Sequence, residues 1–339
     1  MYTMIKEGTS INMKLFAFSL REYDEKQYMD AICEKLGIEY RYTPDYPSNE
    51  NLHLCKGCDC VSIITSITDK PLLDKLYALG VRYIATRSIG YEHIDVAYAH
   101  QLGMKVSNVG YAPESVANYA IMLMLMCCRN ITHILKRADL QDYSLREKIG
   151  RDLSECTVGV IGTGRIGRTV MKHLSGFGCP MLAYDLVENE EAAALGRYVD
   201  LDTLLRESDI ITLHAPATGD NTHMIDDEAI AKMKPGAILI NTARGPLVDS
   251  DALIRGLESG KIGAAGLDVI EHEAGLYYLN RMNQPIANHD MAILRSFPNV
   301  VITPHTAFYT HRSVRDMVEN AVKGLYAFAN GQENPFEVK

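Results

Sequence analysis

Short apolar runs alternate with amphipathic segments along almost the whole chain. Apolar runs bounded by turn residues fit buried strands of a parallel sheet, and apolar residues spaced three or four apart fit helices that cover it. The alternation predicts an α/β fold built from βα units. It is interrupted by one long segment of high apolar density, Pro113–Asn130. We expect this segment to be a largely buried helix that joins two domains.

The first βα series predicts a domain of residues 13–111 together with residues 307–339. We expect an amphipathic helix at Thr310–Gly331, late in the chain, to return to this domain. Its other predicted elements are the strands Lys14–Ser19, Cys60–Thr65, Val81–Ala85 and Val106–Val109 and the helices Glu25–Leu36 and Pro71–Ala78.

The second βα series predicts a dinucleotide-binding domain of residues 112–306, after a polar stretch, Arg137–Ser154, of surface loop and short helix. Six strands with crossover helices would make such a domain complete. The predicted strands are Val158–Ile161, Met181–Tyr184, Ile210–Leu213, Ala237–Asn241, Ala264–Asp268 and Val300–Thr303. The predicted helices are Arg165–Gly176, Leu201–Glu207, Asp227–Met233 and Ser250–Ser259.

A glycine-rich motif, G-x-G-x-x-G, follows the first strand of this series and opens its first helix. In that context Gly162 permits a tight turn, Gly164 lets the backbone approach a pyrophosphate, and Gly167 lets helix and strand pack closely. Asp185 ends the next strand, where a carboxylate binds the adenosine ribose hydroxyls and repels a 2′-phosphate. The motif therefore predicts NAD, rather than NADP, as the cofactor.

Composition and charge limit the classes of binding partner that we expect. The formal net charge is −9, and no cluster of lysine and arginine suggests nucleic acid or an anionic membrane as partner. The polar segment Met1–Asn12 lacks the apolar core of a signal peptide, and Met13 is a second candidate start. The run Cys55–Cys60 contains three cysteines without a second Cys/His pair at zinc spacing. Reduced thiols in a cytoplasmic protein without a metal are therefore the favoured interpretation, with a metal site as the alternative.

Candidate chemical groups follow three late strands, at the sheet edge where such folds bind ligands. Arg244 follows one strand, and its guanidinium can hold a carboxylate through two hydrogen bonds. The acids Asp268, Glu271 and Glu273 end or follow the next strand, and His305 follows the last. A dehydrogenase of 2-keto acids needs a cation for the carboxylate, an acid to protonate the ketone oxygen and a group that keeps this acid protonated.

These motifs resemble the signatures of the D-isomer-specific 2-hydroxyacid dehydrogenases over essentially the whole length from Met13. The motifs are Gly162–Gly167, Asn241–Asp249 and Thr303–Tyr309. Within the family the chain looks most like D-lactate dehydrogenases, including the vancomycin-resistance type. That resemblance rests on Arg87–Asp95, Asn108–Val116 and the extended loop Gly275–Pro298.

The resemblance implies two Rossmann-like domains, a flavodoxin-like substrate domain and an NAD domain, with a cleft between them and a homodimer as the assembly. It also implies an Arg–Glu–His site in which Arg244 binds the carboxylate, His305 donates the proton and Glu273, rather than Glu271, is the partner of the histidine. The implied NAD contacts beyond the glycines and Asp185 are Arg165, Ile166, Ala215, Pro216, Asn221, Thr242, Ala243, Arg244 and Asp268. The implied substrate contacts beyond Arg244 and His305 are the backbone donors Ile89 and Gly90 and the pocket walls Tyr111 and Phe308.

One segment departs from the family. Several D-lactate and D-hydroxyisocaproate dehydrogenases have a tyrosine in the loop after the third strand, where this chain has Thr65–Thr68. The departure predicts a roomier or more polar pocket, so we expect pyruvate or a somewhat larger 2-keto acid as substrate.

Two alternatives stay open at this stage. One is another dehydrogenase of the family, acting on phosphoglycerate or formate. The other is a non-catalytic NAD-sensing protein of the corepressor type, in which the same residues persist.

Overall fold

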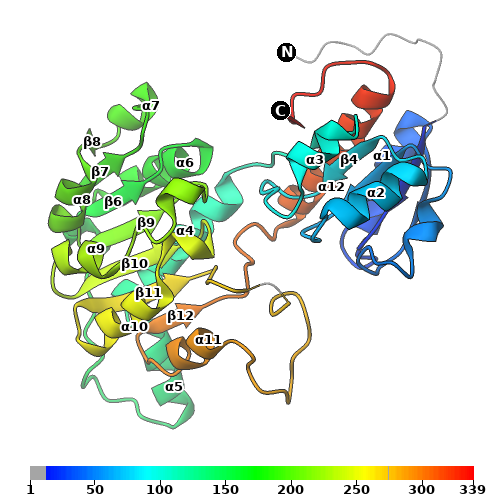
Figure 1. The fold of residues 1–339 in the computed structure, drawn as a ribbon. Coiled ribbons are helices and arrows are strands. Elements are labelled where there is room, and N and C mark those ends of the chain that lie inside the picture. The colour runs from blue at the N-terminus through cyan, green and yellow to red at the C-terminus, as the bar shows by residue number, and fades with distance from the viewer. Residues whose placement is uncertain (1–12, 274) are drawn as a thin grey trace. The chain divides into compact units, whose positions relative to one another are not determined.

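The computed structural model describes residues 13–273 and 275–339. The chain divides into two compact units (Figure 1). The first contains the residues up to Ala112 together with Tyr309–Lys339, and the second is Pro113–Phe308. The division proposed from the sequence differs from these units by one residue at Ala112 and by two at Phe308.

The first unit is built on a largely parallel sheet in the order β13-β5-β4-β3-β1-β2. The part of this order formed by β2-β1-β3-β4-β5 is that of the flavodoxin-like folds. Only the last segment of the chain departs from it, since β13 pairs with β5 in the antiparallel direction. The strands are β1 Lys14–Ala17, β2 Glu39–Tyr42, β3 Cys60–Ile63, β4 Tyr83–Thr86, β5 Lys105–Ser107 and β13 Glu337–Val338.

Capping residues set the helix limits in this unit. Asp69 accepts a hydrogen bond from the Leu72 amide and starts α2, and Gly37, at φ +66°, ends α1. The C-terminal helix α12 packs against α1 and β4, so it returns to this unit as the sequence predicted. The helices are α1 Lys26–Leu36, α2 Lys70–Ala78, α3 Val96–Gln101 and α12 His311–Ala329, with a 3-10 turn, η1, at Leu52–Cys55.

The second unit is built on a parallel sheet in the order β12-β11-β10-β9-β6-β7-β8. The strand order reverses between β6 and β9, and the carboxyl ends of strands at such a point are where doubly wound sheets bind ligands. The strands are β6 Val158–Ile161, β7 Met181–Tyr184, β8 Arg197–Tyr198, β9 Ile210–Leu213, β10 Ala237–Asn241, β11 Ile262–Leu267 and β12 Val300–Ile302.

Both faces of this second sheet are buried. Successive side chains of a strand point to opposite faces, so Ile238 and Ile240 of β10 join one core and Leu239 joins another. Helices α4 Glu114–Cys128, α6 Arg165–Leu174 and α7 Glu190–Ala193 supply the core with Ile238. Helices α8 Leu201–Glu207, α9 Asp227–Lys232, α10 Ser250–Glu258 and α11 His289–Leu294 supply the core with Leu239. The remaining elements are α5 Ile131–Asp139 and the 3-10 turns η2 Leu153–Glu155, η3 Ser175–Phe177, η4 Gly219–Asn221 and η5 Gly245–Leu247.

Some elements escaped the sequence prediction. Edge strand β2 carries no apolar run, and β8, which extends the sheet beyond the six predicted strands, has only two residues. The short helices α3, α7 and α11 were also missed, and α11 lies inside the segment that the sequence suggested to be an extended loop. The long helix α4 ends at Cys128, two residues before the predicted limit, because Asn130 is left-handed with φ +53°.

The three clustered cysteines lie in the core of the first unit. Cys55, Cys58 and Cys60 are all buried and reduced, and burial raises the pKa of the Cys55 thiol to about 11. A metal ligand is a thiolate, which such burial disfavours. In residues 13–273 and 275–339, no group of three or more His, Cys, Asp or Glu side chains is arranged to hold a metal ion.

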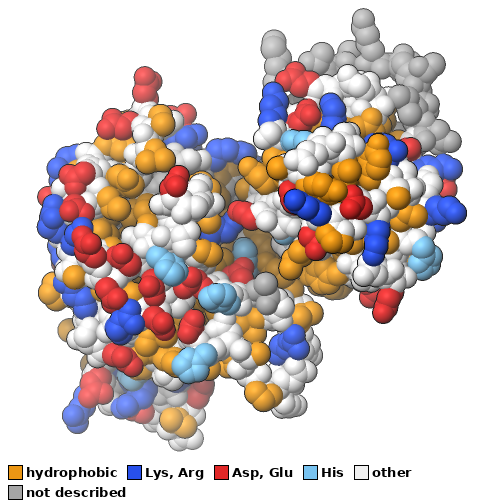
Figure 2. Space-filling view, in the orientation of Figure 1, with side chains coloured by type: hydrophobic (Ala, Val, Ile, Leu, Met, Phe, Trp, Pro, Cys, Tyr) orange, Lys and Arg blue, Asp and Glu red, His pale blue; other side chains and the backbone are white. Residues whose placement is uncertain are grey.

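The next feature is the distribution of charged side chains on the surface. On the face shown in Figure 2, acidic and basic side chains are interspersed, without a continuous basic area. Among the described residues, no helix combines the length and the apolarity needed to cross a bilayer.

Candidate active site

The glycine-rich turn after β6 has the geometry that the motif requires. Gly162 has φ +91°, and a Cβ there would lie 2.6 Å from the amide nitrogen of Ala215. Only glycine combines that backbone conformation with so close an approach. A Cβ on Gly167 would lie 1.9 Å from the carbonyl oxygen of Gly162, so the first turn of α6 packs directly on the turn. Gly164, by contrast, has nothing within 4 Å of its Cβ position, which leaves its backbone open to a ligand.

Asp185 is fixed at the carboxyl end of β7 by the same turn. Its Oδ2 accepts hydrogen bonds from the Thr163 amide at 2.6 Å and the Thr163 hydroxyl at 3.0 Å. Tyr198, from the unpredicted strand β8, donates to the Thr163 hydroxyl at 2.7 Å. The carboxylate is thereby held beside the phosphate-binding turn, in the position a ribose-binding acid needs.

Two buried polar atoms lie unpaired near this sheet edge. Within the described part of the chain, Thr242 Oγ1 after β10 and His214 Nδ1 after β9 have no hydrogen-bond partner. Burial lowers the pKa of His214 to about 3, so its ring is neutral. The open glycine, the fixed carboxylate and these unpaired atoms fit a dinucleotide lying across the strand ends.

Arg244 lies three residues after the end of β10, half-buried at the start of η5. Its carbonyl oxygen accepts a hydrogen bond from Asn241 Nδ2 at 2.9 Å, and its own Nη1 donates to the Ala243 carbonyl at 2.8 Å. The next residue, Gly245, lies so close to the β11 loop that a Cβ would be 2.1 Å from the Ile270 carbonyl oxygen. The loop that carries Arg244 is therefore packed on the loop that carries the acids.

His305 and Glu273 form a hydrogen-bonded pair. The distance between His305 Nδ1 and Glu273 Oε1 is 2.6 Å, and the two side chains are 27% and 26% exposed. Glu273 Oε2 also accepts from the Ile270 amide at 3.1 Å. The pair is oriented and still reachable from solvent, as a proton-donating site requires.

His305 has a left-handed backbone, with φ +52°. Such a conformation is uncommon outside glycine and is found where the surroundings impose it. Here Asp268, which is fully buried, imposes it: its carboxylate accepts from the amides of Thr306 and Ala307, both at 2.9 Å, and from the Thr303 hydroxyl at 2.6 Å. Burial raises the pKa of Asp268 in spite of these donors. This supporting role of Asp268 was not apparent from the sequence.

Glu271 has a different partner. Its Oε1 lies 2.6 Å from His223 Nε2, and its Oε2 accepts from the Ser250 amide at 2.9 Å. Burial alone would raise the pKa of Glu271, but the bonds from His223 and Ser250 lower it. The hydrogen bond between His223 and Glu271 also raises the pKa of His223. The structure thus brings Glu273, and not Glu271, to His305, and His223 is a residue that the sequence reasoning missed.

The remaining predicted site residues are divided between the units. Ile89, Gly90 and Tyr111 lie in the first unit, half-buried, and Ile89 and Gly90 belong to the turn that follows β4. Phe308 lies in the second unit, with its ring centroid 6.4 Å from that of His305 in an edge arrangement. The other predicted cofactor contacts lie at the carboxyl ends of β6, β9 and β10 in the second unit: Arg165, Ile166, Ala215, Pro216, Asn221 and Ala243.

Comparison with known proteins shows which protein family this chain is related to. A family model of the NAD binding domain of D-isomer specific 2-hydroxyacid dehydrogenases matches residues 121–307. The chain belongs to the D-isomer-specific 2-hydroxyacid dehydrogenase family. An aromatic 2-oxoacid reductase of Clostridium sporogenes is 45% identical over 319 residues, which cover 93% of this chain and 96% of that protein. A D-specific alpha-keto acid dehydrogenase of Enterococcus faecium is 42% identical over 314 residues, which cover 92% of this chain and 96% of that protein.

Solved structures give the same relationship. The crystal structure of D-lactate dehydrogenase with NAD⁺ from Lactobacillus jensenii superposes with a TM-score of 0.84 at 35% identity, covering 96% of this chain and 100% of that one. The protein is therefore an NAD-dependent D-2-hydroxyacid dehydrogenase. The predicted family, the fold of two Rossmann-like domains and the cofactor NAD are confirmed.

Proposed function

We propose that this dehydrogenase reduces pyruvate or a somewhat larger 2-keto acid to the D-2-hydroxy acid, with His305 as the proton donor. The observation that carries the proposal is the 2.6 Å contact between His305 Nδ1 and Glu273. Because Nδ1 faces the carboxylate, Nε2 is the nitrogen that gives its proton to the ketone oxygen. A carboxylate at this distance stabilises the protonated ring, the form that reduction consumes.

The bound cofactor supplies the hydride that adds to the carbonyl carbon. The chain's own residues bind, orient and protonate the keto acid. Arg244 carries a fixed positive charge and a planar fork of donors, so it binds the carboxylate and helps to polarise the ketone. In the reverse direction, neutral His305 accepts the hydroxyl proton and Glu273 stabilises the resulting charge.

The size of the substrate side chain is the finer part of the proposal. The segment Thr65–Thr68 after β3 carries no tyrosine, and Ile67 is 74% exposed. Among the relatives is the aromatic 2-oxoacid reductase of Clostridium sporogenes. Both observations favour a pocket that accepts side chains larger than the methyl group of pyruvate.

Steady-state kinetics with pyruvate, 2-ketobutyrate, 2-ketoisocaproate and phenylpyruvate test this part. We expect kcat/KM for at least one larger keto acid to equal or exceed that for pyruvate. A strict preference for pyruvate would contradict the roomier pocket. Lack of turnover with every keto acid would favour the non-catalytic, NAD-sensing alternative.

Cofactor preference gives a first prediction. Asp185→Ser should lower the preference for NADH over NADPH, measured as the ratio of kcat/KM values, by about tenfold, because a fixed negative charge facing the 2′-phosphate is lost. Asp185→Asn keeps an acceptor for the Thr163 amide and controls for loosening of the turn. Equal use of both cofactors by the unaltered enzyme would refute the ribose assignment.

Glu273→Gln gives a second prediction. The amide keeps most of the shape but removes the negative charge beside His305, on which the proposed proton donation depends. The kcat for keto-acid reduction near neutral pH should therefore fall. Glu271→Gln is the matched control, since its carboxylate faces His223 instead. Steady-state kinetics of both variants at neutral pH measure the difference, and a loss of rate in Glu271→Gln alone would reverse the assignment.

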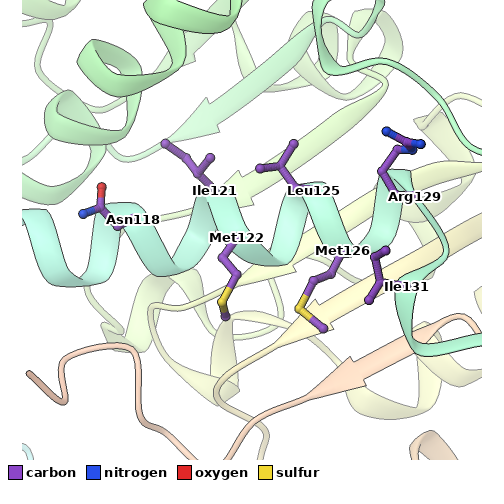
Figure 3. Close-up of a pocket in the computed structure, with 7 residues that line it drawn as sticks. All are labelled: Asn118, Ile121, Met122, Leu125, Met126, Arg129 and Ile131. Atoms are coloured by element: carbon purple, nitrogen blue, oxygen red, sulfur yellow. The ribbon is translucent and has the colours of Figure 1, made fainter. Parts of the chain in front are cut away.

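We also propose that the enzyme forms a homodimer through the region of α4 and α5. Helix α5 buries none of its residues, and large apolar side chains are exposed around it. These are Met122, Leu135, Leu140, Leu145 and Ile149, with exposed fractions from 39% to 89%. Met122 and Met126 extend from one side of α4 beside Ile131 (Figure 3). So many exposed large apolar side chains within one stretch of the chain, residues 122–149, are unusual on a monomer surface.

Sedimentation equilibrium gives the third prediction. The unaltered chain should have about twice the 37.7 kDa mass of one chain, and Leu140→Asp combined with Leu145→Asp should shift it toward the monomer. Leu186→Asp is the control, because Leu186 is 90% exposed after β7 and lies outside this region. A monomeric unaltered chain would contradict the proposal.

A further inference from the structure

In the turn after β4, the backbone carbonyl oxygens of residues 88–90 all accept hydrogen bonds from other groups of the protein. Three successive carbonyls accept hydrogen bonds: Ser88 from the Val109 amide at 3.2 Å, Ile89 from Asn108 Nδ2 at 2.7 Å, and Gly90 from the Ser88 hydroxyl at 2.6 Å. The peptide groups are trans and planar, so each N–H points away from the carbonyl of its own peptide. The amide N–H groups of Ile89, Gly90 and Tyr91 therefore point away from these hydrogen-bonded carbonyl oxygens.

Those amides are available to a ligand. Within the described residues, none of the three donates a hydrogen bond to another group of the protein. Ile89 and Gly90 are half-buried, so the two amides lie where water competes only partly. Successive backbone amides with fixed directions form anion-binding sites. This geometry suits the carboxylate of a keto acid, for which the family resemblance implies Ile89 and Gly90 as backbone donors.

Two separate supports hold the turn. The first is Asn108, whose own amide donates to the Phe336 carbonyl at 3.1 Å, so the segment before β13 anchors it. Asn108 and Val109 together supply the bonds to Ile89 and Ser88, and both follow β5, the neighbouring parallel strand. The direction of the Ile89–Gly90 peptide therefore depends on the side-chain amide of one residue.

The second support is a chain of hydroxyl groups with one possible direction. The Ser88 hydroxyl has one proton and donates it to the Gly90 carbonyl. Thr86 Oγ1 must therefore be the donor to Ser88 Oγ, 2.7 Å away. Thr86 then has no proton left for His93 Nε2 at 3.0 Å, so His93 donates from Nε2. Thr86 is fully buried, which makes each of these bonds costly to lose.

We propose that Asn108, with Ser88 as the second support, is a positioning residue that aims the Ile89, Gly90 and Tyr91 amides at the substrate carboxylate. This inference rests on the proposed function, because the anion it concerns is the carboxylate of the proposed keto-acid substrate, for which the family resemblance implies Ile89 and Gly90 as backbone donors. It adds the residues that set the direction of the donors. In this role the two side chains act through the Ile89 and Gly90 carbonyls that they hold.

Binding of oxamate, a carboxylate-bearing analogue of pyruvate, to the enzyme–NADH complex tests the inference without requiring turnover. Oxamate binding is followed by NADH fluorescence, and NADH affinity is measured separately. Asn108→Leu and Ser88→Ala should each weaken oxamate binding roughly tenfold, the effect of one lost hydrogen bond to an anion site. Affinity for NADH should stay within about twofold. In turnover, KM for the keto acid should rise more than kcat falls.

Two further variants separate positioning from general stability. Ser88→Thr keeps the hydroxyl and should restore most of the oxamate affinity. Asn330→Leu removes a similar amide-to-carbonyl bond, to Tyr326, in the same unit and should leave oxamate binding unchanged. Unchanged oxamate affinity in Asn108→Leu and Ser88→Ala, or an equal loss in Asn330→Leu, would overturn the inference. If the unaltered enzyme binds oxamate but reduces no keto acid, the proposed function fails while the positioning role stands.

Discussion

His305→Gln is expected to lower kcat for keto-acid reduction by about 10²–10⁴-fold, the usual contribution of a general acid. The amide cannot supply a proton to the ketone oxygen at neutral pH. The backbone at this position is left-handed, which glutamine tolerates poorly, so His305→Asn is the better variant for separating chemistry from folding. Both should lose activity to a similar extent, while NADH affinity changes little. A variant with full activity would end the proposed mechanism.

The effect of His305 should not add to that of Glu273. Both residues act on one proton, and their side chains are 2.6 Å apart. Once the histidine is gone, the charge of Glu273 has no protonated ring to stabilise, so the double variant should be no slower than His305→Gln alone. Additive losses would show that Glu273 acts through another group.

Arg244→Lys is expected to lower kcat/KM for the keto acid by about 10²-fold or more, through a higher KM and a lower kcat. Lysine keeps the charge but loses the planar fork that holds a carboxylate by two bonds. NADH affinity should change much less, although Arg244 also matches a cofactor position. Steady-state kinetics and NADH titration measure the two effects separately.

Arg255→Lys is the matched control for Arg244→Lys. Arg255 also forms a two-bond pair with a carboxylate, that of Asp227, but on the exposed surface of α10. The exchange there should leave the keto-acid kinetics unchanged. Unaltered kinetics in Arg244→Lys would remove this residue from the site.

The strands buried on both faces were the easiest elements to predict. Val158–Ile161, Met181–Tyr184 and Ile210–Leu213 were predicted with the limits that the structure shows, because each is a mainly apolar run bounded by polar residues, glycine or proline. The edge strand β2 alternates polar and aromatic residues and is half-exposed, so no apolar run marks it. Short edge elements depend on the neighbour they pair with, and a local pattern does not contain that neighbour.

In the candidate active site, too, some features could be predicted from the sequence and others could not. The glycine motif and the position of His305 after the last strand were evident in the sequence, since both depend on local spacing. The choice between Glu271 and Glu273 came from family resemblance, and spacing alone left it open. It depends on the path of the loop after β11, which packs against Gly245 at Ile270 and places Glu271 beside His223 and Glu273 beside His305. The buried support that Asp268 gives to the His305 turn is equally a product of tertiary packing.

The stereochemistry and rate of keto-acid reduction by the unaltered enzyme and by His305→Asn test directly whether the enzyme makes a D-2-hydroxy acid with His305 as proton donor. NADH oxidation is followed with pyruvate and phenylpyruvate, and the product is resolved on a chiral column. We expect the D-2-hydroxy acid from the unaltered enzyme and a rate lower by about 10²–10⁴-fold in the variant, with NADH binding retained. An L-product, or equal rates in the two proteins, would contradict it.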